Sequence, residues 1–161
     1  GQGFLTTTPM QLAVMTAMFA NNGKRIFPTI YKNLDQINAN ENQVFTTQTL
    51  YQKKFFSLIK NSMFLAVNKP FGTAYGSRAS KPIFAGKTGT VQVRNISSEE
   101  REIGIIPNKE LPIEQRDHAL FIGFAPYKNP TIAVSVVIEH GGSGSKIAAP
   151  IAKNIFQKVL S

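Results

Sequence analysis

Three segments of the chain carry an apolar residue at every third or fourth position, the spacing that predicts amphipathic helices. These segments span residues 9–20, about 49–67 and 146–160. The first has clear ends, because Thr8 is a favoured cap residue, Pro9 suits the first helical position and the Asn-Asn-Gly sequence at 21–23 stops a helix. The pattern therefore predicts a helix near the start of the chain, a longer one in the middle and one at the end.

The same pattern assigns faces to the later two helices. In the middle helix, the predicted core face is formed by Phe55, Leu58, Ile59, Ser62, Met63 and Ala66. The predicted water-facing side holds Lys53, Ser57, Lys60 and Asn61. In the last helix, one apolar stripe consists of Ile147, Ile151, Ile155 and Val159, and beside it lie Ala148, Ala152, Phe156 and Leu160.

Three stretches rich in apolar and β-branched residues predict strands at residues 84–93, 118–125 and 131–139. The Pro-Tyr-Lys-Asn-Pro turn at 126–130 is tight and favours antiparallel pairing of the last two strands. The connection at 94–117 is long for a hairpin and is acidic, so we expect it to be functional or mobile. The order of elements predicts an α/β (α+β) fold, in which helices pack on an antiparallel sheet of at least three strands.

Composition limits the chemistry that the chain can perform. The 161 residues are 42% hydrophobic and 17% charged, as in a globular domain, and the absence of Cys excludes thiol catalysis, disulfides and cysteine-based metal sites. The net charge of +9 could attract an anionic partner. The basic residues are scattered, however, without the arginine-rich tract or interleaved aromatic residues of single-strand binders. A solvated, Lys-rich surface is the simpler interpretation.

The sequence Ala-Gly-Lys-Thr-Gly-Thr at residues 85–90 is the segment that best suits chemistry. On a strand, Lys87 and Gly89 share one face, and Thr88 and Thr90 share the other. Gly89 lets a ligand approach the backbone closely, the hydroxyls could hold a carboxylate, and an exposed strand edge could pair with an extended peptide. The alternative is a glycine-rich turn with a solvated Lys. A phosphate-binding P-loop is excluded, because the Gly-x-x-x-x-Gly-Lys-Ser/Thr spacing is absent.

The Lys-Thr-Gly-Thr sequence at 87–90 resembles the third active-site motif of penicillin-binding proteins and serine β-lactamases. The Gly-Gln-Gly sequence at 1–3, followed by Thr-Pro-Met-Gln-Leu-Ala at 8–13, is similar to a signature of class B transpeptidases. Further segments resemble the elongation (rod-shape) subclass: Arg-Asp-His at 116–118, Gly-Phe-Ala-Pro-Tyr at 123–127 and Glu-His-Gly-Gly at 139–142. The resemblance covers nearly the whole chain, with its elements in family order.

This resemblance implies a partial penicillin-binding-protein/serine β-lactamase-like transpeptidase fold. Residues 1–161 would be the C-terminal portion of a single transpeptidase domain that lacks the upstream Ser-x-x-Lys and Ser-x-Asn motifs. The parent would be a peptidoglycan D,D-transpeptidase that cross-links stem peptides through a serine acyl-enzyme during cell-wall elongation. The fragment alone is expected to be inactive.

The resemblance also implies roles for individual residues. Lys87, Thr88, Gly89 and Thr90 would be catalytic, and Lys87, Thr88 and Thr90 would bind substrate. The threonine hydroxyls would hold the terminal carboxylate of the stem peptide or of a β-lactam, and the Thr90 backbone N–H would form half of an oxyanion hole. Gln2 would lie on the rim of the substrate site.

The implied partners are those of a cell-wall enzyme. They are the stem peptide, β-lactams, a glycan polymerase and other proteins of the elongation machinery, with no nucleic acid, cofactor or metal. No apolar run approaches the roughly 20 residues that span a bilayer, so a membrane anchor is expected upstream. The protein would face the periplasmic side of the bacterial inner membrane.

Two further matches to the family's motifs are rejected. The Ser-x-x-Lys pattern at 57–60 follows the Thr-Pro-x-Gln helix instead of preceding it, and Ser57 and Lys60 are predicted to face water. Activating a serine needs a base whose pKa is lowered, which an exposed Lys would lack. The Tyr-Lys-Asn sequences at 31–33 and 127–129 mimic the second motif, but neither lies in family order.

A Ser-His-Asp triad built on Asp117 is also disfavoured. Asp117 and His118 are adjacent, and adjacent residues of a strand point to opposite faces. We expect them to orient the loop that enters the strand, through a salt bridge with Arg116.

Other functions stay open from the sequence. The same fold serves D,D-carboxypeptidases and β-lactam sensors. A basic module that binds nucleic acid or an anionic surface is a second class, and a protein that has lost its chemistry and serves as an assembly platform is a third.

Overall fold

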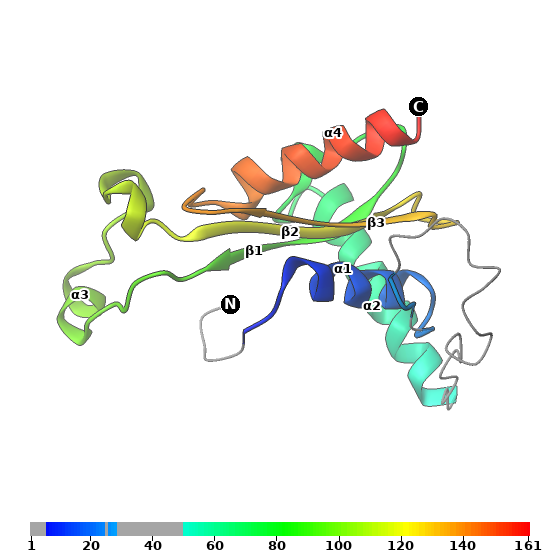
Figure 1. Cartoon of the computed structure of the whole chain (residues 1–161), viewed down its shortest axis with the longest axis horizontal. Helices are drawn as coiled ribbons and strands as arrows, with labels where there is room; N and C mark the ends of the chain where they lie inside the picture. The colour runs from blue at the N-terminus through cyan, green and yellow to red at the C-terminus, as the bar shows by residue number, and fades with distance from the viewer. Residues whose placement is uncertain (1–5, 25, 29–49) are drawn as a thin grey trace.

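The computed structural model describes residues 6–24, 26–28 and 50–161 (Figure 1). Gln2 and the Tyr-Lys-Asn sequence at 31–33 therefore lie outside the described residues. The helices and strands are α1 (Pro9–Ala20), α2 (Leu50–Asn68), β1 (Ala85–Val91), α3 (Ser98–Ile103), β2 (His118–Ala125), β3 (Ile132–Ile138) and α4 (Ala149–Val159). Their order confirms the predicted sequence of helices and strands, with α3 added between the first two strands.

Helix α1 begins and ends where its sequence predicts. Thr8 and Gln11 form a capping box, in which each side chain accepts a hydrogen bond from the other residue's backbone N–H. After the helix, Asn22 and Gly23 adopt positive φ angles of 54° and 95°. A right-handed helix cannot continue through residues with these angles. Thr16 is fully buried, which its polar side chain does not predict, and its hydroxyl donates to the Leu12 carbonyl at 2.7 Å.

The three strands form one antiparallel sheet in the order β1-β2-β3. In the register, Lys87 lies opposite Ile122 on β2, and Ile122 lies opposite Ser135 on β3. The predicted α+β arrangement is therefore confirmed. Among the described strands, β1 pairs only with β2, so it forms one edge of the sheet.

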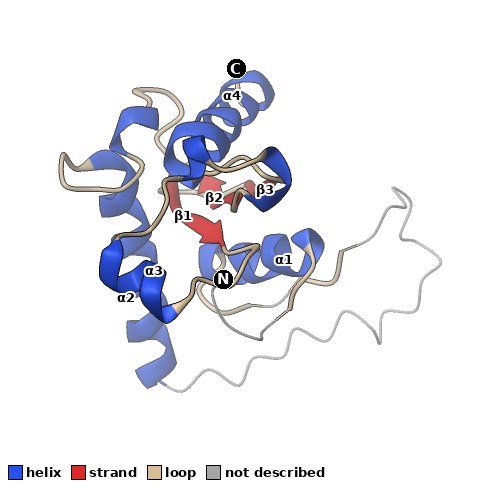
Figure 2. Cartoon of the chain, turned by 90° about the vertical axis from the view of Figure 1, so that its left-hand side faces the viewer, coloured by secondary structure: helices blue, strands red, loops and turns tan. Residues whose placement is uncertain are grey.

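Helices cover both faces of the sheet. Figure 2 shows α4 above the strands and α1 below them, and α2 packs against β1. On the α4 side, the core contains Phe84, Phe121 and Phe156, and the Phe84 ring centroid lies 6.2 Å from that of Phe121 and 5.2 Å from that of Phe156. On the side of α1 and α2, a smaller core contains Ala20, Met63, Ala85 and Phe124. The sheet and its two layers fix the position of β1.

The predicted core face of α2 is partly wrong. Phe55 and Leu58 are 59% and 60% exposed, and Ser62 is also exposed. Ile59 and Met63 face the core as predicted, Val67 is buried as well, and the ring of Phe56 contacts Phe19. The error is small, because each of the three misplaced residues has an apolar neighbour that is buried or half-buried: Phe56, Ile59 and Met63.

Helix α4 and the helical turn before it bury only one of their two apolar rows. Ala148, Ala152 and Phe156 are fully buried against the sheet. The neighbouring row, Ile147, Ile151, Ile155 and Val159, is between 36% and 60% exposed. A continuous apolar stripe of this kind is unusual for a surface helix and marks a face that another element can cover. None of the helices in the described ranges is long and apolar enough to cross a membrane.

Candidate functional site

The Lys-Thr-Gly-Thr segment lies in the middle of the edge strand β1. Lys87 and Thr90 are exposed, whereas Thr88 and Gly89 are half-buried. The segment is therefore accessible along its length. It is extended as part of β1, so the alternative of a glycine-rich turn is wrong. An exposed edge strand presents backbone N–H and C=O groups that can pair with another extended chain.

The side chains of the segment alternate between the two faces of the sheet. Lys87 lies opposite Ile122, which packs against the core on the side of α1 and α2. Thr88 lies opposite Phe121, and Thr90 lies opposite Ala119; both partners belong to the core on the α4 side. The cation and the hydroxyls thus reach the edge of β1 from different faces, as strand alternation predicts.

Hydrogen bonds connect the polar groups at this edge. The Lys87 ammonium donates to the Thr88 carbonyl at 2.8 Å and to the Thr88 hydroxyl at 3.4 Å. The Thr88 hydroxyl in turn donates to the hydroxyl of Thr73 at 3.0 Å. Because alternate residues of an antiparallel strand direct their backbone groups to the same edge, the Thr90 N–H faces the same edge as the Thr88 carbonyl.

Two contacts hold β1 in place from its flanks. The Asn68 side chain at the end of α2 donates to the Phe64 carbonyl at 3.0 Å and to the Phe84 carbonyl, just before β1, at 2.9 Å. On the opposite face, Gly144 lies so close to the strand that an added Cβ would stand 2.3 Å from the Gly89 carbonyl oxygen. The Lys-Thr-Gly backbone is therefore held in place by contacts on both faces.

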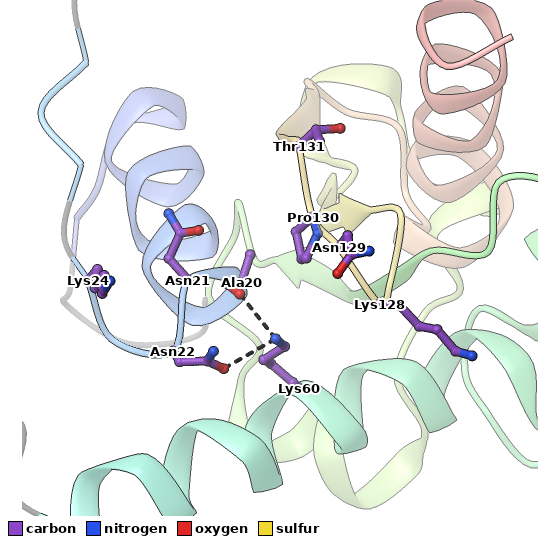
Figure 3. A pocket seen from close by; sticks show the side chains of 9 residues that line it. All are labelled: Ala20, Asn21, Asn22, Lys24, Lys60, Lys128, Asn129, Pro130 and Thr131. Carbon is purple, nitrogen blue, oxygen red and sulfur yellow. Dashed lines mark hydrogen bonds between the residues drawn. The ribbon is translucent and has the colours of Figure 1, made fainter.

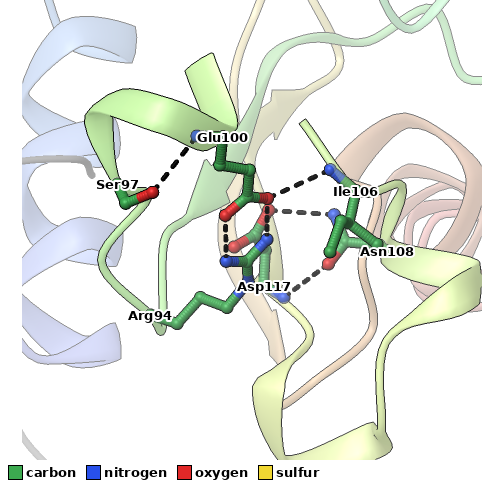
Figure 4. Close-up of polar contacts among 6 residues, drawn as sticks. All are labelled: Arg94, Ser97, Glu100, Ile106, Asn108 and Asp117. Carbon is green, nitrogen blue, oxygen red and sulfur yellow. Dashed lines mark hydrogen bonds and ion pairs between the residues drawn. The ribbon is translucent and has the colours of Figure 1, made fainter. Parts of the chain in front are cut away.

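The acidic connection after β1 is an ordered arm that carries α3. Ser97 caps α3 by accepting from the Glu100 N–H at 3.1 Å (Figure 4). The Glu100 carboxylate forms a two-pronged ion pair with Arg94 and accepts from the Ile106 N–H at 3.1 Å. These contacts close the arm on itself, next to the C-terminal end of β1.

The far end of the arm is fixed by an Asn–Asp pair. Asn108 donates to the Asp117 carboxylate at 2.9 Å and accepts from the Asp117 N–H at 2.7 Å (Figure 4). The expected salt bridge between Arg116 and Asp117 is not formed, because Arg116 donates through Nε to the Leu111 carbonyl at 3.0 Å. The loop that enters β2 is thus held by hydrogen bonds of Asp117 and Arg116 to uncharged groups, and a salt bridge between the two is not needed.

The ion pair of the arm gives a pH-dependent prediction. Hydrogen bonds from Arg94 and from the Ile106 N–H lower the pKa of Glu100 from its ordinary 4.5 to about 2. Because the folded pKa is the lower one, the pair stabilises the arm above pH 4.5, and this stabilisation is lost as the pH falls toward 2. Above pH 4.5, the amide hydrogens of residues 98–107 should exchange more slowly in the whole wild-type protein than in its Glu100→Gln variant.

This difference should shrink as the pH falls below 4.5 and disappear only well below pH 2, where the protonated Glu100 is as uncharged as a glutamine. Glu102→Gln, an exposed position on the same helix, is the matched control and should exchange as the wild type does. Equal protection of wild type and Glu100→Gln at pH 6 would show that the ion pair does not order the arm.

Lys60 is not water-facing, which corrects the prediction for the Ser-x-x-Lys match at 57–60. Lys60 is half-buried, and its ammonium donates to the Ala20 carbonyl at 3.1 Å and to Asn22 Oδ1 at 3.2 Å (Figure 3). Burial lowers the pKa of the Lys60 ammonium. Ser57 is exposed, as predicted. The Lys60 ammonium donates to Ala20 and Asn22 rather than to Ser57.

The surroundings of Lys60 favour a structural role. It lines a cavity of about 790 Å³ together with Lys24 and Lys128, near the turn between β2 and β3 (Figure 3). The ammonium sits at the C-terminal end of α1, where the helix dipole and the unpaired carbonyls favour a cation. Lys60 therefore joins α1 to α2 by capping α1.

The other residues that mimic catalytic groups also have structural partners. The ring of Tyr127 packs on the ring of Phe64, with centroids 4.5 Å apart. The backbone N–H of Tyr127 donates to the Ile83 carbonyl at 2.8 Å. His118 Nδ1 accepts from the His140 N–H at 2.9 Å, and the two rings pack edge to face. The Tyr-Lys-Asn sequence at 127–129 thus belongs to a packed turn, and the histidines tie the end of β3 to the start of β2.

Comparisons with known proteins agree with one another. The family model described as penicillin binding protein transpeptidase domain matches residues 1–157. Peptidoglycan D,D-transpeptidase MrdA of Salmonella typhimurium (strain SL1344) is 32% identical over 169 residues, which cover 99% of this chain and 26% of the relative.

Solved structures resemble the chain over its full length. PBP2 of Pseudomonas aeruginosa, in complex with WCK 5153, is 36% identical with a TM-score of 0.76, covering 99% of this chain and 31% of that one. PBP2 of Helicobacter pylori, in complex with MreC, is 30% identical with a TM-score of 0.79, covering 99% and 26%. The chain thus spans about a quarter to a third of the length of these relatives.

Proposed function

Because this chain belongs to the penicillin-binding protein transpeptidase family, we propose that it forms one wall of the active site of a peptidoglycan D,D-transpeptidase that acts in cell-wall elongation. The observation that carries the proposal is the accessible edge of β1, where the Lys87 ammonium, the Thr88 and Thr90 hydroxyls and the Gly89 backbone lie on consecutive residues. A single strand edge thus offers a positive charge, hydroxyl donors and, from Thr88 and Thr90, main-chain groups that face the same edge.

The proposed chemistry follows from these groups. The stem peptide lies along β1 as an additional strand, and its terminal carboxylate is held by the hydroxyls of Thr88 and Thr90. The Lys87 ammonium adds positive potential beside that carboxylate and helps to relay protons. The Thr90 N–H donates to the oxyanion that develops when the scissile carbonyl is attacked. Gln2, at the rim by resemblance, completes the proposed substrate contacts.

The nucleophile of this reaction is supplied by the rest of the whole protein. A serine of an upstream Ser-x-x-Lys motif attacks the donor peptide and displaces the terminal D-alanine, giving an acyl-enzyme that an amine of a second stem peptide resolves. The exposed stripe of α4, Ile147 to Val159, is available to pack against that upstream part. Residues 1–161 would then be the C-terminal portion of one transpeptidase domain.

The proposed setting is the periplasmic side of the bacterial inner membrane, with an anchor outside residues 1–161. The proposed partners are the stem peptide, β-lactams, a glycan polymerase and other elongation proteins. A complex with MreC is known for the similar PBP2 of Helicobacter pylori, which supports a partner of the elongation machinery here.

Fluorescent penicillin tests the proposal directly. The whole protein that contains this chain should be labelled covalently, and prior incubation with unlabelled penicillin should prevent the labelling. Peptide mapping should place the adduct on a serine outside residues 1–161, and the isolated chain should stay unlabelled.

Two outcomes would contradict this reading. If penicillin did not label the whole protein, no acyl-enzyme would form and the proposed mechanism would be wrong. If the adduct were on Ser57, the Ser-x-x-Lys match at 57–60 would contain the nucleophile. With stem-peptide substrate, cross-linked products identify a transpeptidase, whereas release of D-alanine without cross-links identifies a D,D-carboxypeptidase.

A further inference from the structure

The hydroxyl of Thr88 has a partner that the Lys-Thr-Gly motif does not contain. Thr88 Oγ1 lies 3.0 Å from Thr73 Oγ1, across a separation of 15 residues in the sequence. Thr88 donates its hydrogen to Thr73 and accepts from the Lys87 ammonium at 3.4 Å. A hydroxyl has a single hydrogen, so Thr88 cannot donate to Thr73 and to a ligand carboxylate at the same time.

The segment that carries Thr73 is anchored on both sides of it. An added Cβ at Gly72 would lie 2.3 Å from the Ala66 carbonyl oxygen, so the chain touches the last turn of α2. Ala74 is 2% exposed, and its N–H donates to the same Ala66 carbonyl at 2.9 Å. Thr73 itself is exposed, yet its backbone is held between two fixed neighbours. Its hydroxyl is therefore presented to Thr88 from a rigid support.

We propose that Thr73 is a positioning residue for substrate binding, and that the direction of its hydrogen bond with Thr88 reverses when a carboxylate binds. Both hydroxyl hydrogens rotate about their C–O bonds: Thr73 becomes the donor to Thr88, and Thr88 donates to the carboxylate. No bond to carbon breaks and no proton leaves either residue. This inference rests on the proposed function, because it assumes that Thr88 holds the carboxylate of the acyl donor.

The reversal has a physical advantage for the site. A hydroxyl that accepts a hydrogen bond becomes a stronger donor, since hydrogen bonds in a chain polarise one another. The Thr73 hydroxyl also fixes the position of Thr88 Oγ1, which otherwise rotates about its side-chain bond. Thr73 thus acts on the ligand through Thr88 and does not need to touch it.

Penicillin acylation of the whole protein tests the inference. Thr73→Val keeps the shape of the side chain but removes the hydroxyl, and it should weaken the initial non-covalent binding of penicillin by roughly 10-fold, the effect of one hydrogen bond. The rate of the covalent step at saturating penicillin should change little. Thr73→Ala should give the same loss, and Thr73→Ser should restore binding because it keeps the hydroxyl. The thermal unfolding midpoint should be the same in all three.

A double-mutant cycle shows whether Thr73 acts through Thr88. In a Thr88→Val background, Thr73→Val should have no further effect on penicillin binding. The inference is overturned if Thr73→Val binds penicillin as the wild type does, or if its effect persists undiminished when Thr88 has been replaced. A wild-type protein that penicillin does not label at all would instead overturn the proposed function, and this inference with it.

Discussion

Lys87→Ala should reduce the second-order rate constant for penicillin acylation of the whole protein by roughly 10²- to 10³-fold, the usual effect of removing one preorganised electrostatic group from an acyl-transfer site. The Lys87 ammonium lies at the exposed edge of β1 and already contacts the Thr88 carbonyl and hydroxyl. A bound carboxylate would exclude water from this edge, and the attraction between the two charges would rise as the local dielectric constant falls. Stopped-flow or gel-based labelling with fluorescent penicillin measures the rate.

Two further variants separate charge from geometry at this position. Lys87→Arg keeps the positive charge but replaces a compact ammonium by a planar fork, so it should recover only part of the rate. Lys158→Ala removes an equivalent charge from an exposed position on α4 and should label like the wild type. Undiminished labelling of Lys87→Ala would contradict the role proposed for Lys87.

Features that depend on neighbours in the sequence were predicted well. Thr8 caps α1 and Pro9 occupies its first position, as predicted, although the second half of the capping box, made by Gln11, was not predicted. The three strands lie within two residues of their predicted ends, because Gly, Pro and acidic residues mark those ends locally. The accessible Lys-Thr-Gly edge was also predicted. Strand alternation alone assigned Lys87 and Thr88 to opposite faces of the sheet, as the register confirms.

The face of α2 could not be predicted from periodicity alone. Phe55 and Phe56 are adjacent, and so are Leu58 and Ile59, so two overlapping apolar stripes fit the sequence. The fold selects the stripe in which Phe56 joins Ile59 and Met63, and it leaves Phe55 and Leu58 exposed. Tertiary packing decides between faces that local pattern leaves equal.

Contacts between distant residues were out of reach of the sequence. Thr73 meets Thr88 across 15 residues, His140 meets His118 across 22, and Lys60 meets Ala20 across 40. In none of these pairs does the separation along the sequence indicate that the two residues are in contact. The exposed Lys60 that was expected is instead half-buried, because α1 ends directly over it. The residues that support the site are therefore visible only once the chain is folded.

Gly144→Ala gives the second large expected effect, because the backbone of the Lys-Thr-Gly strand lies directly against this position. A Cβ at Gly144 would stand 2.3 Å from the Gly89 oxygen, 2.4 Å from the Leu120 oxygen and 3.0 Å from the Gly89 nitrogen. All three are backbone atoms of paired strands, so none can move aside by changing a rotamer. We expect a loss of stability of about 3 kcal/mol, at the upper end of overpacking effects.

The same substitution should also disturb the site. Relieving the overlap pushes Gly89 away from Gly144, and this shift moves the flanking Thr88 and Thr90 relative to any bound acyl donor. Thermal denaturation of the whole protein should therefore show a lower midpoint, and penicillin acylation should slow below the melting range. Gly76→Ala is the matched control, since no atom lies within 4 Å of a Cβ at that exposed position, and it should change neither quantity. If Gly144→Ala melted and acylated as Gly76→Ala does, the segment before α4 would not be what holds the Lys-Thr-Gly strand in place.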